Sequence, residues 1–333
     1  MTRSVISNII SIIPIGLLLV KNLYKQRRFV KKELSPIINK SFSNNSKNLI
    51  AEDIIKIENY YALFVPAVLG EAFCTLHGEK MTNNERWVST LQSALSAVGD
   101  DFFDKSELPD FDLKDIEQNF SSIKPKTNSE QLFINLFKEL KQTQPNKELF
   151  KCLGSVYKAQ ESSNLQKIQS TPLNHIEKIT ADKGGYSFLF YRWAFTHPLV
   201  NDEKELIYKL GECLQWANDI FDIYEDYKVG IRTVATECSN IELLTKKFQT
   251  QIKEIVKLAY KTNFEQKNIR KFLRIISLSV FSRTMVCLKM LQKNQMLTQN
   301  IFDVSRYSRE QLICDMEKPI NIYKGLWYYI RIL

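Results

Sequence analysis

The sequence predicts an all-α protein, and three observations support that fold class. Only 10 Gly and 9 Pro punctuate the 333 residues, too few for the many turns of a sandwich or barrel. Apolar residues recur at helical spacing over most of the chain, and no segment alternates like a strand for long. The expected helices cover residues 50–78, 84–104, 128–141, 146–160, 203–228, 240–262, 266–294 and 302–314.

The chain contains no segment that resembles a domain linker. The most loop-like stretches, 39–48 and 108–128, are too short to separate domains. We therefore expect residues 1–34 to form an N-terminal apolar and basic helix and residues 35–333 to form a single α-helical domain.

Positive charge is concentrated at the N-terminus. Residues 1–32 contain no acid and carry seven of the nine net positive charges, which leaves +2 for the rest of the chain. Because that remainder also lacks a recognisable nucleic-acid-reading motif, nucleic acid is not an expected partner. The seven basic residues are Arg3, Lys21, Lys25, Arg27, Arg28, Lys31 and Lys32.

Residues 4–20 are apolar enough to suggest contact with a membrane. The segment is slightly short for a span, contains Pro14, and lacks a small-residue cleavage site. Two interpretations stay open: a helix packed on the body of the protein, and an interfacial anchor whose basic flank meets anionic lipid. The corresponding localisation is cytoplasmic, with peripheral membrane contact through residues 1–32 as the open question.

The six cysteines are widely spaced and form no CxxC pair, so we expect reduced and mostly buried thiols. The three histidines, His77, His175 and His197, occur in no ExxH or HD arrangement, which disfavours a histidine-based metal hydrolase.

A first acidic cluster, Asp100-Asp101-Phe102-Phe103-Asp104, lies where an apolar helix is expected to end. Asp100 and Asp104 are four residues apart and share one helical face. Like charges at that spacing repel, and oxygen-only ligands on one face suit Mg²⁺. The alternative is a solvated acidic helix end.

A second cluster extends from Gln215 to Asp226. Asn218, Asp222 and Asp226 are spaced i, i+4, i+8, and Gln215 shares their side of the helix. Carboxylates within an otherwise apolar helix are costly unless a cation meets them. Two such clusters on separate helices would clamp a diphosphate through metal ions and stabilise charge on the leaving group.

At these residues the chain resembles the class I terpene synthase and trans-isoprenyl diphosphate synthase superfamily. Asp100 to Asp104 match the aspartate-rich DDxxD motif of that superfamily. The second metal motif of the superfamily is matched by Gln215, Asn218, Asp219, Asp222 and Asp226. The pattern of these residues is intermediate between the NDxxSxxxE and QxxDDxxD forms of that motif, and it also resembles the acidic segment of squalene and phytoene synthases.

The resemblance implies a helical bundle around a deep apolar cavity, with the acidic helices facing each other. It also implies an enzyme that ionises an allylic prenyl diphosphate with about three Mg²⁺. The implied metal ligands and catalytic residues are Asp100, Asp104, Asn218, Asp222 and Asp226, with Asp101 as an orienting group.

Two departures from the superfamily affect the expected reaction. Asp222 and Asp226 stand where terpene synthases usually have Ser or Thr and Glu. No arginines follow Asp104 as they do in chain-elongating synthases, and no GGKxxRP-like segment for isopentenyl diphosphate is present. These absences favour a cyclase over an elongating enzyme.

Further residues are candidates for binding substrate. Lys183 precedes Gly184-Gly185, where the superfamily breaks a helix, and permissive glycines could approach phosphate. A plain turn is the alternative there, and an ordinary surface role is the alternative for each arginine. The complete set is Lys183, Gln215, Arg232, Arg306, Tyr307 and the aromatic wall residues Phe188 and Trp216.

The leading hypothesis is therefore a Mg²⁺-dependent class I terpene synthase, a carbon–oxygen lyase that yields a hydrocarbon or alcohol. One alternative is a trans-prenyltransferase, either elongating or joining two chains head to head. A second is a non-catalytic, prenyl-lipid-binding helical protein. The expected partner is an allylic prenyl diphosphate, while substrate length and a homodimer stay open.

Overall fold

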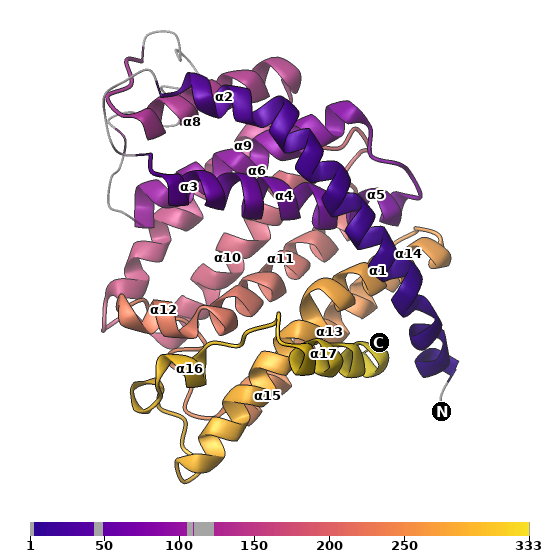
Figure 1. Ribbon diagram of the computed structural model, residues 1–333, viewed down its shortest axis with the longest axis vertical. Helices are drawn as coiled ribbons and strands as arrows, with labels where there is room; N and C mark the ends of the chain where they lie inside the picture. Colours follow the sequence, from indigo (N-terminus) through magenta and orange to yellow (C-terminus); the bar gives the residue numbers. More distant parts are fainter. Residues whose placement is uncertain (1–2, 43–48, 105–108, 110–122, 333) are drawn as a thin grey trace. The chain divides into compact units, whose positions relative to one another are not determined.

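A computed structural model describes residues 3–42, 49–104, 109 and 123–332, and all regular secondary structure in these ranges is helical (Figure 1). This confirms the all-α prediction. The chain divides into two compact units, each described here by itself. The N-terminal unit comprises Leu18–Ser155 and Phe190–Pro198, and the C-terminal unit comprises Met1–Leu17, Val156–Leu189 and Leu199–Leu333. Three helices contribute residues to both units: α1 (Arg3–Phe29), α9 (Lys147–Ser162) and α10 (Leu173–Arg192).

Helix α6 (Asn83–Asp104) is the central helix of the N-terminal unit. Its apolar repeat Val88, Leu91, Leu95 and Val98 is buried, and it packs against α8 and the π-helical turns η2 and η3. The other elements of this unit are η1 (Val30–Leu34), α2 (Ser35–Lys40), α3 (Ala51–Ile55), η2 (Lys56–Tyr61), α4 (Ala62–Phe64), η3 (Val65–Gly70), α5 (Glu71–His77) and α8 (Asn128–Thr143).

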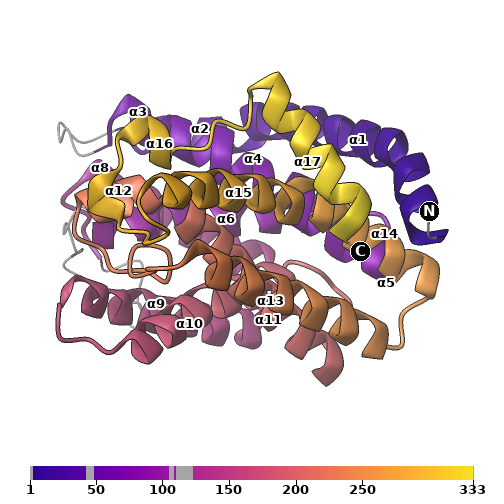
Figure 2. The ribbon, with the colours of Figure 1, turned by 90° about the horizontal axis from the view of Figure 1, so that it is seen from below.

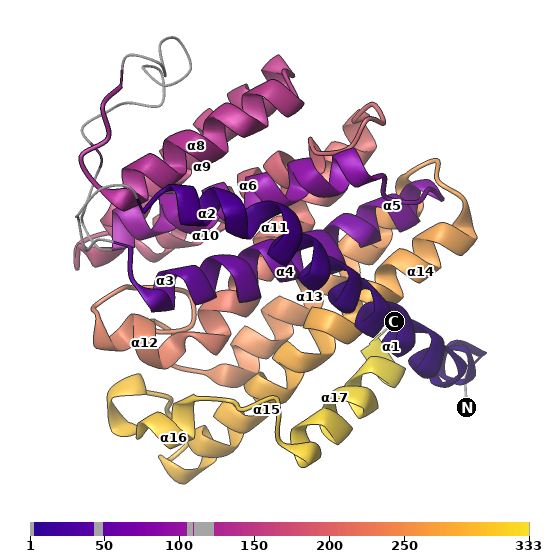
Figure 3. The ribbon, with the colours of Figure 1, turned by 45° about the horizontal axis from the view of Figure 1, so that its top comes forward.

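The C-terminal unit is built around three helices, α11 (Asn201–Phe221), α13 (Ile241–Lys261) and α15 (Ser282–Leu297), which lie side by side in Figure 2. Figure 3 shows α17 (Pro319–Ile332) packed on α15. The other elements are η4 (Ser163–Lys167), α12 (Ile223–Lys228), α14 (Gln266–Ile276), η5 (Ser277–Phe281), η6 (Val304–Arg306) and α16 (Arg309–Leu312).

Most of the expected helices are present within a few residues, but two expectations were wrong. The helix expected over 302–314 is reduced to the short elements η6 and α16, separated by extended residues. The break expected at Gly184-Gly185 does not exist, because both glycines lie inside α10. All six cysteines are free thiols, and all except Cys238 are buried, as expected.

Candidate functional site

The first acidic motif occupies the last turn of α6 in the N-terminal unit. Asp100 accepts a 2.7 Å hydrogen bond from the Tyr61 hydroxyl, and Asp101 forms a 2.5 Å ion pair with Lys56 Nζ. The C-terminal end of a helix carries partial negative charge, so carboxylates there need a cationic partner. Lys56 supplies one for Asp101. The side chain of Asp104 lies outside the described residues.

Neither Lys56 nor Tyr61 was predicted as part of this motif. Both lie on η2, which packs against α6, and the Lys56 ammonium also lies 5.8 Å from the centre of the Tyr61 ring. Both residues are distant from the motif in sequence, so no local pattern predicted this contact. The two residues hold Asp100 and Asp101 on the η2 side of α6.

The second motif lies where α11 gives way to α12 in the C-terminal unit. Asp222 adopts φ −92° and ψ 9° between the two helices, yet its amide still bonds to the Asn218 carbonyl at 2.9 Å. The Asn218 side-chain amide donates a 2.9 Å hydrogen bond to the Asp222 carboxylate. Both side chains are exposed, and Asp226 is half-buried one turn further on. The structure thus brings Asn218 and Asp222 together, as their spacing predicted.

Asp219 is the buried carboxyl of the second motif. It accepts hydrogen bonds from Gln215 Nε2 at 3.0 Å and from Thr180 Oγ1 of α10 at 3.2 Å. Burial raises the pKa of Asp219 to about 6, although these hydrogen bonds and Lys183 act in the opposite direction. Gln215, predicted to bind substrate, is therefore a partner of Asp219, four residues along α11.

Two glycines allow α10 and α11 to cross closely enough for these contacts. A Cβ atom on Gly184 would lie 2.7 Å from Gln215 Cβ, and one on Gly211 would lie 2.9 Å from Phe188 Cβ. These distances are shorter than real contacts, so only glycine fits on either helix. Neither the phosphate-binding loop nor the plain turn considered for Gly184-Gly185 is correct. The physical reason for the error is that a helix crossing also requires residues without a Cβ atom.

Lys183 lies beside the second motif. Its positive charge opposes the burial that raises the pKa values of Asp219 and Asp222. In Asp222, desolvation by the surrounding protein atoms outweighs this attraction and raises the pKa, with a further rise from Glu225. Lys183 therefore offers one positive charge to a group of carboxylates, and it is placed where an anion held by that group would meet it.

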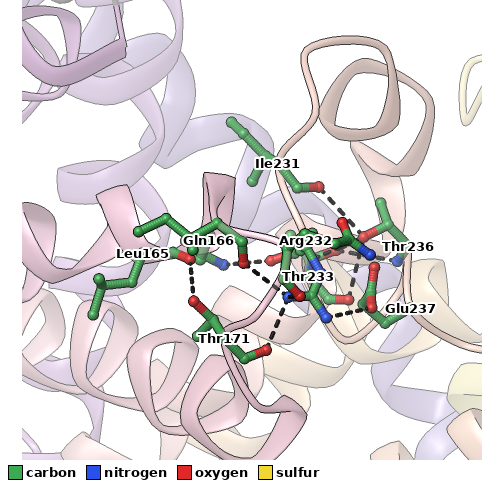
Figure 4. Close-up of polar contacts among 10 residues, drawn as sticks. Leu165, Gln166, Thr171, Ile231, Arg232, Thr233, Thr236 and Glu237 are labelled. Carbon is green, nitrogen blue, oxygen red and sulfur yellow. Dashed lines mark hydrogen bonds and ion pairs between the residues drawn. The ribbon is translucent and has the colours of Figure 1, made fainter.

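Arg232 has a structural role that the sequence did not predict. Its Nη1 donates to the carbonyls of Ile168, Gln169 and Thr171 at 2.8–3.0 Å, and its Nη2 lies 2.7 Å from Glu237. Figure 4 shows the contacts with Thr171 and Glu237. The Arg232 backbone exchanges two further hydrogen bonds with Gln166. Arg232 fastens the loop after η4 to the loop after α12, and its role in substrate binding stays a prediction.

The segment that carries Arg306 and Tyr307 packs against α12, because η6 and α16 both contact that helix. Arg306 is exposed and pairs with Asp303 at 3.2 Å. Tyr307 is buried, stacked on Phe302, with its hydroxyl 2.5 Å from Thr298 Oγ1. Tyr307 thus anchors the segment, and Arg306 stays accessible.

Arg309 is a cation near the second motif that the sequence did not reveal. Its guanidinium lies 5.9 Å from the centre of the Tyr224 ring, and its Nε lies 4.0 Å from Glu225. Because α12 and α16 are distant in sequence, only the fold brings this arginine to the acidic residues.

The two aromatic candidates differ in burial. Phe188 is half-buried at the crossing of α10 and α11. Trp216 is buried, and its indole Nε1 has no hydrogen-bond partner among the described residues. A buried donor without a partner is costly, so this nitrogen is a point at which a bound polar group would be stabilised.

Within the described ranges, no group of three or more His, Cys, Asp or Glu side chains is arranged to hold a metal ion. The second motif still presents oxygen donors of the type that Mg²⁺ prefers, in Asn218, Asp222 and Asp226. Mg²⁺ keeps several waters and phosphate oxygens in its coordination shell, so few protein ligands are sufficient.

Comparison with known proteins identifies no relative of this chain. No family model, no curated protein and no solved structure matches it.

Proposed function

We propose that this chain is a Mg²⁺-dependent class I terpene synthase acting on an allylic prenyl diphosphate. In this proposal each of the two acidic motifs contributes ligands for Mg²⁺. Support comes from the order and spacing of the motifs and from the helical elements that carry them. The proposal also explains why carboxylates occupy the negatively polarised end of α6.

The observation that carries the proposal is the pairing of Asn218 with Asp222. Their side chains lie 2.9 Å apart on an exposed surface, with Asp226 one turn further along the chain. In this contact the Asn218 amide nitrogen faces Asp222, so a rotation of the side-chain amide would present its oxygen, beside the Asp222 carboxylate, to a hard cation. When bound, Mg²⁺ would neutralise charge on the diphosphate leaving group.

The remaining residues of the C-terminal unit have complementary roles in this proposal. Lys183, Arg306 and Arg309 supply positive charge for the diphosphate, since all three lie on elements next to the second motif. Asp219 holds Gln215 and Thr180 in place. Phe188 and Trp216 contribute apolar surface for the prenyl chain.

Incubation of the full-length protein with C10, C15, C20 and C25 allylic diphosphates, followed by mass analysis, tests the proposal. We expect a hydrocarbon or alcohol that forms only with Mg²⁺. Asp100→Ala and Asp222→Ala should each lower turnover by at least about 100-fold, the scale on which electrostatic catalytic groups act. Asp315→Ala, which removes an exposed carboxylate of the C-terminal unit, is the matched control and should leave turnover unchanged.

Three results would change the assignment. A product longer than its substrate, formed with isopentenyl diphosphate, would indicate a prenyltransferase. Full turnover by Asp100→Ala would remove the first motif from the reaction. Absence of product from every substrate, with prenyl diphosphates bound intact, would leave a prenyl-lipid-binding protein.

A further inference from the structure

The first half of α1 exposes an apolar face and buries polar residues, unlike an ordinary surface helix. Asn8 and Ser11 are buried together with Ile15, whereas Ile10 and Ile13 are 71% and 72% exposed. Ile6, Ile9 and Leu17 are exposed on the same side as these two, which places one apolar stripe opposite the polar residues. In water this arrangement is unfavourable, because the exposed apolar side chains contribute no free energy of burial to folding.

Helix α17 presents a second exposed apolar face. Its exposed side carries Ile320, Tyr323 and Trp327, spaced three and four residues apart. The opposite side carries Gly325 and Tyr329, which are buried. Tyr and Trp are the residues that prefer the boundary between lipid and water.

The two helices meet through their polar faces. The Ser11 and Tyr329 hydroxyls lie 2.6 Å apart, and Asn8 Nδ2 donates to the Ile330 carbonyl at 3.3 Å. Figures 2 and 3 show the ends of α1 and α17 next to each other. Helices held together by polar contacts, with apolar side chains outside, are suited to a lipid environment.

The charges on these helices have one sign, and the acids in the adjoining segments include Glu265 before α14 and Asp315 and Glu317 before α17. Helices α1, α14 and α17 contain no Asp or Glu, and α14 contributes the exposed residues Arg270 and Lys271. Arg274 of α14 donates a 2.6 Å hydrogen bond to Ser7 of α1. Arg331 lies over the Trp327 ring, 3.9 Å from its centre. A cationic rim around an apolar stripe is complementary to anionic lipid headgroups.

We propose that α1 and α17 form a docking surface that lies in the headgroup region of an anionic lipid bilayer. The segment Val5–Lys40 is long enough, and contains a stretch apolar enough, to be a candidate membrane span. Spanning would however break the contacts that Asn8 and Ser11 make with α17, so the helix binds in the plane of the interface. A second copy of the chain fits less well, because two cationic rims would repel each other. This surface is independent of the proposed metal site.

Vesicle co-sedimentation of the full-length protein tests this surface. We expect binding to phosphatidylcholine vesicles that contain about 30% phosphatidylglycerol, weakened by salt and by removal of the anionic lipid. Ile10→Gln/Ile13→Gln should weaken binding at least about tenfold, because apolar burial supplies the affinity. The matched control is Leu243→Gln/Leu297→Gln, which changes two exposed apolar residues elsewhere in the same unit. Circular dichroism checks that both variants fold.

Arg270→Gln/Lys271→Gln tests the charge contribution separately and should weaken binding to anionic vesicles only. The proposal is overturned if the Ile10→Gln/Ile13→Gln variant binds like the wild type, or if the wild type does not sediment with anionic vesicles. Equal binding to neutral and anionic vesicles would overturn the anionic preference. A dimer that dissociates in the isoleucine variant, without vesicle binding, would assign the surface to a second copy.

Discussion

Glu85 is the residue whose contacts most directly fix the start of α6. Its carboxylate accepts hydrogen bonds from the backbone and hydroxyl of Thr82, both at 2.9 Å. It also accepts them from the backbone and hydroxyl of Thr196, at 3.2 and 3.1 Å. Burial alone would raise the pKa of Glu85, but these hydrogen bonds outweigh it and lower the pKa. The ionised form therefore stabilises the N-terminal unit.

Glu85→Gln should reduce the free energy of unfolding by about 2 kcal/mol at neutral pH, because charge-assisted hydrogen bonds are lost. The folded-state pKa is below the unfolded one, so this stability is complete above about pH 5 and decreases as pH falls through the folded-state value. Urea unfolding across pH measures both effects. Glu79→Gln, at an exposed position of the same unit, should change little. A difference between wild type and Glu85→Gln that grows in acid would contradict the assignment.

The contacts of a side chain could be predicted only where the two contacting residues are close in sequence. The pairing of Asn218 with Asp222 follows from their i, i+4 spacing, and the structure brings them together. The contacts of Asp101 with Lys56 and of Glu225 with Arg309 join separate elements, so no local pattern announced them. The structural contacts of Arg232 were missed for the same reason, since its carbonyl partners precede it by more than 60 residues.

At the scale of elements, the crossing of α10 and α11 determines the geometry of the second motif. Gly184→Ala should cost at least about 2 kcal/mol of unfolding free energy, because the new Cβ overlaps α11 and forces the helices apart. The same separation would lengthen the hydrogen bond between Thr180 and Asp219. Urea denaturation measures the cost.

Gly154→Ala is the matched control for this substitution. Gly154 lies inside α9, and a Cβ atom there would meet nothing within 4 Å. Alanine at that position should be neutral or stabilise the protein by up to about 1 kcal/mol, through its higher helix propensity. Similar effects of the two substitutions would show that the crossing tolerates a methyl group.

Elements with a strong apolar period were predictable, and elements with unusual faces were not. The period of α6 and its Thr82 and Glu85 cap define that helix from local sequence alone. Helix α10 was missed because its paired glycines look like a break, and glycine has the same sequence signal in a turn and in a close crossing. Helix α17 lay beyond the last expected helix, and its exposed apolar face differs from the usual amphipathic pattern.

At the scale of the whole molecule, ligand binding should appear as thermal stabilisation. Mg²⁺ with pyrophosphate at about 100 times its dissociation constant would add about 2.7 kcal/mol and raise the melting temperature by about 4 °C. Either component alone should have a smaller effect, because the metal and the anion bind together. Differential scanning fluorimetry gives the measurement.

Asp222→Ala should abolish this shift, whereas Asp315→Ala should preserve it. Asp222 and Asp315 are both exposed residues of the C-terminal unit, so a general change in surface charge would affect the two variants alike. An unchanged melting temperature in the wild type would favour a non-catalytic protein. A shift that survives in Asp222→Ala would place the anion elsewhere.

The contact between α1 and α17 has a consequence for synthesis on the ribosome. Ser11 and Tyr329 are separated by 318 positions, and Ser7 and Arg274 by 267, so the polar face of α1 lacks these partners until α14 and α17 emerge. At roughly 5–20 residues per second, that delay lasts tens of seconds. During this time the isoleucine-rich stripe is open to the surroundings of the nascent chain. Lipid or a chaperone would therefore meet α1 before the rest of its own fold does.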